Sequence, residues 1–222
     1  MPGIGTRTRG GLVTDEDGRL REAAVFDALG ARYEQAFAGS EAHRAELDWL
    51  LARLGPGSRV LDVGSGTGRP TAAALAAAGH DVLGIDFSPV MVGLAGQRVP
   101  DATFRCADIR DVPLEDEAYD AVCVFFSLLQ MSRAEQSDVV RRLARALRPG
   151  GHLILATVPL DVQGVDAVFM GQPVRVTSFA AEDVVAVVRA AGLTVLSEET
   201  VMFTPAHAEA APEPHLFVRC RR

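Results

Sequence analysis

The sequence predicts an α/β fold in which a doubly wound, seven-stranded sheet carries helices on both faces. Seven short apolar runs, partly β-branched, are bounded by Gly, Pro or acidic turns. Segments of helical length separate the first five runs, and such crossovers connect parallel strands. Only a loop rich in Pro and Ala, residues 204–214, separates the last two runs, so the seventh strand should run antiparallel to the sixth.

The chain begins with a segment rich in Gly, Thr and charge, and we expect residues 1–20 to form a flexible arm. Residues 21–222 then form a single domain, in which residues 21–55 supply N-terminal lid helices. Leucines at helical spacing predict the second of these helices, with Ser40 as its N-cap and Gly55 at its end.

The strands and the later helices follow in order. Ser88 and Pro89 form an N-cap and N1 pair for the helix after the second strand. Ser132 with Glu135 forms a capping box for the helix after the fourth strand. A further helix lies before Gly192, although Ala180 stands where a capping hydroxyl would be better. The expected strands are residues 59–64, 81–87, 102–108, 119–127, 152–158, 193–203 and 215–222.

Composition limits the classes of function. The chain has 222 residues, is 48% hydrophobic and has a net charge of −7, which suits one globular domain and disfavours nucleic acid or anionic membranes as partners. The three cysteines, Cys106, Cys123 and Cys220, lack the close spacing of a metal site and are expected to be reduced thiols. With no apolar run long enough for a membrane span or signal peptide, we expect a cytoplasmic monomer or homodimer without a metal.

Three glycines follow the first strand directly. Gly64, Gly66 and Gly68 form a G-x-G-x-G loop after Asp62, at the edge where α/β sheets bind ligands. A tight turn alone explains one such glycine but not three. In dinucleotide folds the spacing is G-x-G-x-x-G, and here Arg69 occupies the place of that third glycine, which disfavours an NAD-dependent oxidoreductase.

Two further acids end the second and third strands. Asp86 is placed to accept hydrogen bonds from both ribose hydroxyls of a nucleoside. Asp108 is placed to accept one from an adenine amino group, although a lone Asp after a strand is more often a helix cap or a turn residue. Together with the glycine loop, these acids predict a nucleoside ligand with a positively charged, phosphate-free tail.

At these motifs the sequence resembles the class I S-adenosylmethionine-dependent methyltransferases. The resemblance covers about residues 40–220 and rests on "VLDVGSGTG", "GIDFS", "CADI", "YDAVCVFFSLLQM" and "LRPGGHLIL". It implies a Rossmann-like sheet of order 3-2-1-4-5-7-6, with the seventh strand antiparallel. It also implies S-adenosyl-L-methionine as the cofactor and a methyl acceptor as the second substrate.

The same resemblance assigns roles to individual residues. Asp62 and the glycine loop would hold the methionine end, Asp86 the ribose, and Phe87 the adenine face. Phe125 would flank the sulfonium methyl group. The full set of cofactor-binding residues implied is Asp62, Gly64, Ser65, Gly66, Gly68, Asp86, Phe87, Ala107, Asp108, Ile109 and Phe125.

Methyl transfer from a sulfonium is an in-line displacement, so a catalytic base is optional. His207 and His215 flank the loop between the last two strands on the cofactor side, and His215 is the better candidate. Tyr33 either covers the cofactor or packs in the core. His43 is expected to be solvated on its helix, and the remaining histidines, His80 and His152, lie at the opposite edge of the sheet.

Four segments are expected to shape the acceptor site: the N-terminal helices, the loop after the fourth strand, the segment after the fifth, and the last hairpin. Met131, Phe169 and Met170 would make it apolar, which suits a small hydrophobic metabolite methylated on O, N or C. Abundant Ala, Gly and Val, with arginine rather than lysine, is typical of GC-rich bacteria and their secondary metabolism. The alternatives are a non-methylating enzyme of the same fold, catalysing a cyclisation or decarboxylation, and a non-catalytic binding module.

Overall fold

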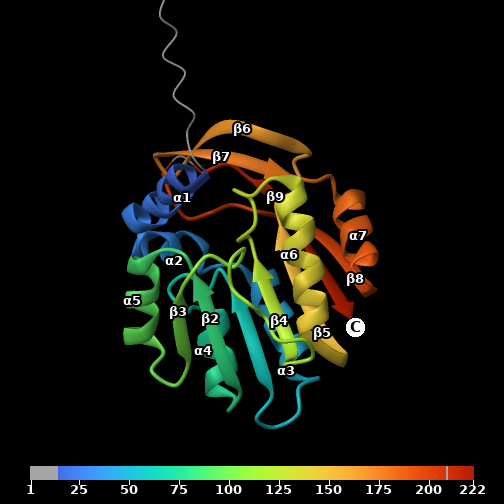
Figure 1. Cartoon of the computed structure of the whole chain (residues 1–222). Coiled ribbons are helices and arrows are strands. Elements are labelled where there is room, and N and C mark those ends of the chain that lie inside the picture. The colour runs from blue at the N-terminus through green and yellow to red at the C-terminus, as the bar shows by residue number, and fades with distance from the viewer. Residues whose placement is uncertain (1–14, 209) are drawn as a thin grey trace, which may run out of the picture.

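A computed structural model describes residues 15–208 and 210–222. Its central sheet has seven strands in the order β3-β2-β1-β4-β5-β9-β8 (Figure 1). The strands are β1 (Arg59–Val63), β2 (Asp81–Asp86), β3 (Thr103–Cys106), β4 (Tyr119–Phe125), β5 (Leu147–Thr157), β8 (Thr194–Phe203) and β9 (Glu213–Arg221).

The strand order confirms the predicted topology, with β8 and β9 as the expected sixth and seventh strands. β9 pairs antiparallel with both β5 and β8, and the other pairs in this sheet are parallel. In register, Val63 lies beside Ile85 and Val124, so β1, β2 and β4 end at one edge of the sheet. Because β9 is reversed, its first residues lie at that same edge, where Leu216 pairs with Thr157.

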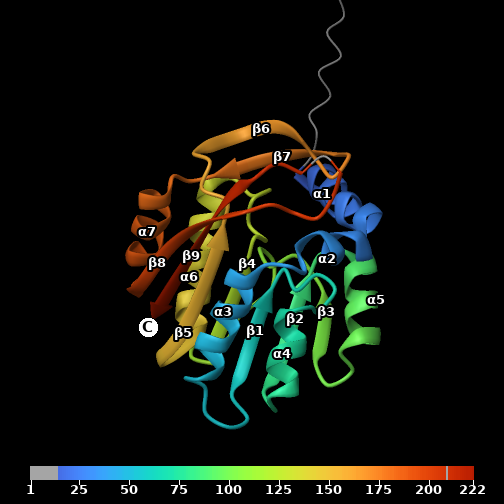
Figure 2. The same ribbon diagram turned by 180° about the vertical axis from the view of Figure 1, so that it is seen from behind.

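Helices cover both faces of this sheet, as predicted (Figures 1 and 2). One face packs on α3 (Glu41–Leu51) and α4 (Thr71–Ala77), and the other on α6 (Arg133–Ala146) and α7 (Ala181–Ala190). A fifth helix, α5 (Pro89–Arg98), lies along the β3 edge.

The predicted caps form at the starts of these helices. The side chains of Ser40 and Ser88 accept backbone hydrogen bonds, and Ser132 with Glu135 makes both bonds of a capping box. The prediction that α3 ends at Gly55 is wrong by one turn, because the helix ends at Leu51.

Two helices precede α3. They are α1 (Asp15–Leu29) and α2 (Ala31–Phe37), and both lie beside the carboxyl edge of the sheet (Figure 2). Residues 1–14 of the expected flexible arm lie outside the described residues. The predicted boundary at residue 20 is too late, because residues 15–20 already belong to α1.

A β-hairpin that the sequence did not predict follows β5. It consists of β6 (Val162–Phe169) and β7 (Gln172–Ser178), joined at Met170 and Gly171, which both have positive φ as two-residue hairpin turns require. The hairpin crosses above the carboxyl edge of the sheet (Figure 1). Its base is held to the loop after β4, because Thr177 N donates to the Leu129 carbonyl at 2.7 Å.

Candidate functional site

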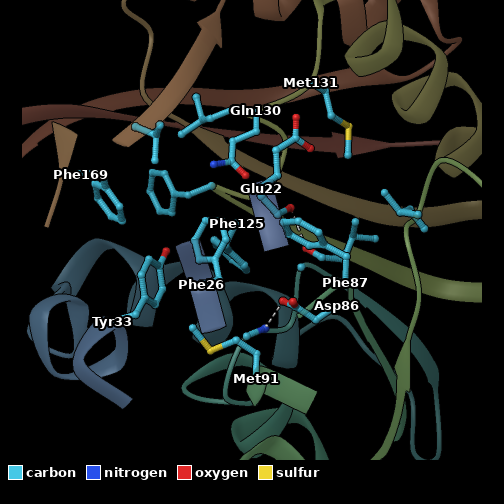
Figure 3. Close-up of a pocket in the computed structure, with 18 of the residues that line it drawn as sticks. Glu22, Phe26, Tyr33, Asp86, Phe87, Met91, Phe125, Gln130, Met131 and Phe169 are labelled. Atoms are coloured by element: carbon cyan, nitrogen blue, oxygen red, sulfur yellow. Dashed lines mark hydrogen bonds between the residues drawn. The ribbon is translucent and has the colours of Figure 1, made fainter. Parts of the chain in front are cut away.

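Two adjoining cavities lie at the carboxyl edge of the sheet, with volumes of about 1340 and 1150 Å³ when the open space at their mouths is included. The glycine loop borders both, α1 and α2 close one side, and the β6–β7 hairpin covers the larger cavity (Figure 3). The residues that line both cavities are Tyr33, Phe37, Gly64, Gly66, Phe125 and Phe126. A ligand with one polar end and one apolar end could therefore extend through both.

The three glycines of the loop are required for different reasons, although all have positive φ. A Cβ at Gly64 would lie 2.1 Å from Ser127 Cβ, and a Cβ at Gly68 would lie 3.0 Å from the Phe104 ring. At Gly66 a Cβ would meet nothing within 4 Å, and this residue borders both cavities. Gly66 is therefore the position where bare backbone faces open space in both cavities, whereas Gly68 lines neither cavity and serves packing.

Asp62 is buried below the smaller cavity, which it lines. Its Oδ2 atom, like Ser65 Oγ in the same wall, is enclosed without a hydrogen-bond partner among the described residues. Burial, and secondarily the charge of Asp86, raises the pKa of Asp62 to about 7. Two orphaned buried oxygens are costly unless a ligand supplies donors, so this wall fits the ammonium end of an amino-acid group.

Asp86 ends β2 and faces the larger cavity (Figure 3). Its Oδ2 accepts from Gly66 N at 2.8 Å and its Oδ1 from Ser88 N at 2.9 Å. Burial raises the pKa of this carboxyl, and the backbone donors oppose that effect. Each carboxylate oxygen has a second lone pair, so the geometry fits hydrogen bonds from two adjacent hydroxyls. The next residue, Phe87, packs edge to face on Phe26 of α1 at 5.8 Å.

Asp108 lies in the same cavity wall, between Ala107 and Ile109. Arg110, which the sequence analysis did not single out, donates to both Asp108 oxygens at 2.7–2.9 Å. Burial alone would raise the pKa of Asp108, but the hydrogen bonds and charge of Arg110 outweigh it and lower the pKa. Arg110 also binds Glu135 at 3.0 Å. Asp108 is therefore a fixed carboxylate in the wall rather than a solvated turn residue.

The N-terminal helices are tied to the loops of the site by three acids. Each acid bonds to a loop that carries a different candidate ligand residue, so α1 and α2 close over the site as a unit. The contacts are Glu22 with Arg110 at 3.2 Å, Asp27 with Ser88 Oγ at 2.5 Å, and Glu34 with Thr67 Oγ1 at 2.6 Å.

Tyr33 of α2 lines both cavities, and Figure 3 shows its side chain in the wall of one of them. Its ring packs on Phe26, Phe37 and Phe169 at 4.9–6.2 Å. Burial raises the pKa of its hydroxyl, and the nearby charges of Asp86 and Glu213 add to the effect. A neutral tyrosine between the two carboxylates fits the predicted covering role.

The two candidate catalytic histidines differ in position. His215 is 1% exposed and lines the smaller cavity, and its Nε2 lies 2.9 Å from Glu213 Oε1. His207 lines neither cavity, because it belongs to the turn after β8. The structure therefore brings His215 and Tyr33 together and leaves His207 outside the site.

The expectation that His43 is solvated is wrong. Its ring stacks on Phe125 at 3.8 Å, and its Nε2 lies 3.0 Å from Thr71 Oγ1 in the wall of the smaller cavity. Burial, with a contribution from His215, lowers the pKa of His43 to about 3, so the ring is neutral. His80 and His152 border neither cavity, as expected.

The predicted apolar residues line the larger cavity only in part. Met131 and Phe169 border it, whereas Met170 forms the hairpin turn and does not. Several further apolar residues line this cavity that were not named individually from the sequence, although most lie in segments expected to shape the acceptor site. They come from α2, from the ends of β4 and β5, from the segment after β5 and from the hairpin. These are Phe37, Phe126, Val158, Leu160, Val174 and Val176.

Comparisons with known proteins agree with this geometry. Residues 60–151 match the family model described as a methyltransferase domain. A demethylmenaquinone methyltransferase from Beutenbergia cavernae is 39% identical over 140 residues, which cover 60% of this chain and 56% of that protein. Residues 60–151 therefore form a methyltransferase domain.

Other methyltransferases align with the chain over similar lengths. Methyltransferase GfsG of Streptomyces halstedii is 33% identical over 127 residues, which cover 54% of this chain and 45% of that protein. The chain spans about half the length of the curated relatives it matches.

Solved structures share the methyltransferase fold over nearly the whole chain. A Burkholderia thailandensis 1,6-didemethyltoxoflavin-N1-methyltransferase, solved with its substrate and S-adenosylhomocysteine, has a TM-score of 0.70 at 21% identity and covers 97% of this chain and 93% of that one. The [4+2]-cyclase SpnF has a TM-score of 0.71 at 21% identity, with coverages of 92% and 96%. At this identity the likeness shows the fold alone.

The described residues contain no helix with the length and apolar character that crossing a membrane requires. Within the same residues, no group of three or more His, Cys, Asp or Glu side chains is arranged to hold a metal ion.

Proposed function

We propose that this protein transfers a methyl group from S-adenosyl-L-methionine to an O, N or C atom of a small hydrophobic acceptor. One observation carries the proposal: a wall of buried, incompletely paired polar groups adjoins an aromatic cavity through shared residues. The polar wall fits the charged amino-acid end of S-adenosylmethionine, and the aromatic cavity fits an apolar acceptor. The bacterial origin of the methyltransferases named above supports a bacterial metabolite as acceptor.

The cofactor-binding residues divide by cavity. When bound, S-adenosylmethionine supplies an electrophilic methyl group on a sulfonium. Asp62 and Ser65 would bind its amino-acid end beside the backbone of Gly64 and Gly66. In the larger cavity, Asp86 would bind the ribose hydroxyls, Phe125 would flank the methyl group, and the adenine would lie among Phe87, Ala107, Asp108 and Ile109.

The chain's own contribution to the reaction is alignment, exclusion of water and electrostatic complementarity. Tyr33 and Phe169 close the space between the N-terminal helices and the hairpin. The carboxylates of Asp62 and Asp86 favour the cationic S-adenosylmethionine over the S-adenosylhomocysteine that remains after transfer, which has lost the sulfonium charge. This difference helps S-adenosylhomocysteine to leave. His215 contributes by holding the carboxylate of Glu213, which lines the acceptor side of the site.

Two measurements test the proposal. Calorimetry should show that S-adenosylmethionine binds to the wild-type protein. A methyl-labelled cofactor, incubated with a panel of hydrophobic phenols, amines and acids, should then leave label in a product. Binding without transfer to any acceptor in the panel or in a cell extract would favour the non-methylating alternative, and absence of binding would reject the proposal.

A further inference from the structure

We propose that Glu213, held in place by His215, selects acceptors that present an O–H or N–H group on an apolar frame. The inference rests on the proposed function and names the class of acceptor that the same site takes. It is carried by the position of a single carboxylate within an aromatic wall.

Glu213 is the first residue of β9, and its side chain, 31% exposed, lines the larger cavity. The other ionisable groups of that cavity lie on the nucleoside side and are already engaged. Asp86 binds backbone donors, and Arg110 joins Asp108 to Glu22. On the side formed by the hairpin and β9, the described lining contains one charged side chain, that of Glu213.

The walls around Glu213 are apolar. Tyr33, Phe37, Phe126 and Phe169 line the same cavity, together with valines of β7. In such surroundings a carboxylate gains more from a hydrogen-bond donor than it would in water, and it repels an anion or an unpaired carbonyl oxygen more strongly. The local chemistry therefore distinguishes hydroxyl and N–H groups from carboxylates and ethers.

His215 fixes this carboxylate from behind. Residues 213 and 215 lie on the same face of β9, and His215 Nε2 is 2.9 Å from Glu213 Oε1. The imidazole is held between aromatic rings, with centroids at 4.4 Å from Phe126, 5.1 Å from Phe203 and 6.4 Å from Phe37. Because His215 itself is 1% exposed, it acts as a positioning residue while Glu213 meets the acceptor.

The test uses four naphthalene probes that differ in one group: 2-naphthol, 2-naphthylamine, 2-methoxynaphthalene and 2-naphthoate. Their binding to the full chain is measured by calorimetry at neutral pH, with and without S-adenosylhomocysteine. The two donors should bind about tenfold more tightly than the ether and the anion. Equal affinities, or failure of all four probes to bind, would overturn the proposal.

Two variants assign this selectivity to residues. Glu213→Gln keeps the size of the side chain and removes its charge, so the penalty on 2-naphthoate should shrink by at least about threefold. His215→Phe keeps the aromatic packing and removes the Nε2 donor, so it should lose selectivity in the same direction. His215→Asn, which retains an N–H donor, should restore part of it.

Other outcomes contradict specific parts of the proposal. Unchanged selectivity in Glu213→Gln would overturn the role of Glu213, and full selectivity in His215→Phe would reduce His215 to packing. S-adenosylhomocysteine affinity should stay within about twofold in Glu213→Gln, because Glu213 lines the acceptor side of the larger cavity. His215 lines the smaller cavity, so the His215 variants are compared by their selectivity among the four probes. If the wild-type protein selects among the probes but does not bind S-adenosylmethionine, the proposed function fails and this inference stands.

Discussion

Asp62 makes the stability of the protein depend on pH. Its ionised form lowers the free energy of unfolding but should strengthen cofactor binding. The substitution Asp62→Asn removes the charge at constant size. In the folded protein the pKa of Asp62 is about 7, against 3.8 for an unperturbed aspartate, so the folded state favours the protonated form. The cost of ionising this group therefore appears as pH rises above about 4 and stops growing above about 7.

The size of the effect follows from the two pKa values. Their separation corresponds to about 4 kcal/mol of destabilisation at about pH 8. About 2 kcal/mol of this falls between about pH 5.5 and 8, since most of the remainder accumulates at lower pH. Asp62→Asn lacks this titration, so the ligand-free variant should gain stability relative to wild type as pH rises. Its affinity for S-adenosylmethionine should fall, because the ligand's ammonium loses a counter-ion.

Urea unfolding at several pH values, followed by circular dichroism, measures this difference directly. Asp81→Asn is the matched control, because Asp81 begins β2 on the surface, with its side chain 69% exposed. The control should follow wild type within about 0.5 kcal/mol. Parallel loss of stability in wild type and Asp62→Asn across this pH range would refute the reasoning.

The remaining predictions concern the glycine loop and the nucleoside wall. Gly64→Ala should lower the free energy of unfolding by more than about 3 kcal/mol in urea titrations, because its Cβ would overlap Ser127. Gly66→Ala should cost only about 1–2 kcal/mol of stability but weaken S-adenosylmethionine binding in calorimetry, whereas the similarly strained, remote Gly57→Ala should leave binding unchanged. Asp86→Ala should weaken that binding by at least about tenfold, and unchanged affinity would remove the ribose assignment. Arg110→Met should destabilise the protein by about 1–3 kcal/mol, because the half-buried Asp108 carboxylate loses its closest charged partner and keeps the more distant Arg19, 3.8 Å away; a thermal shift under about 2 °C would contradict this.

The sheet order was predictable because each crossover leaves a local signature. Ser88 and Ser132 mark helix starts through side-chain caps that depend on residues three positions away. In the β6–β7 hairpin, the sequence of β6 lacks the alternation of apolar and polar residues that marks a half-buried strand, because most of β6 is not buried against the rest of the protein. Val168, which an alternating pattern would bury, is 73% exposed. The hairpin therefore reads as an irregular loop in the sequence.

The gathering of Asp62, Asp86 and Asp108 at one edge of the sheet was predictable for a similar reason, since each lies within two residues of the end of a strand. The acceptor half depends on contacts between distant segments. Arg219 of β9 binds Glu46 of α3 at 2.8–3.0 Å, and that packing places His43 beside His215. No spacing in the sequence indicates that His43 and His215 lie close together. His43 was therefore expected in solvent, and Glu213 was not identified as a candidate site residue.

The reversed direction of β9 has a consequence for how this scaffold changes its chemistry. The wall that we assign to the nucleoside comes from consecutive strands in the first two thirds of the chain, whereas the wall that we assign to the acceptor comes largely from the hairpin and from the beginning of β9. These later segments can be exchanged as a block while β1, β2 and β4 keep their registers. The range of acceptors can therefore change when one contiguous segment is replaced. A hybrid protein joined at the end of β5 would keep the cofactor-binding residues of its N-terminal parent.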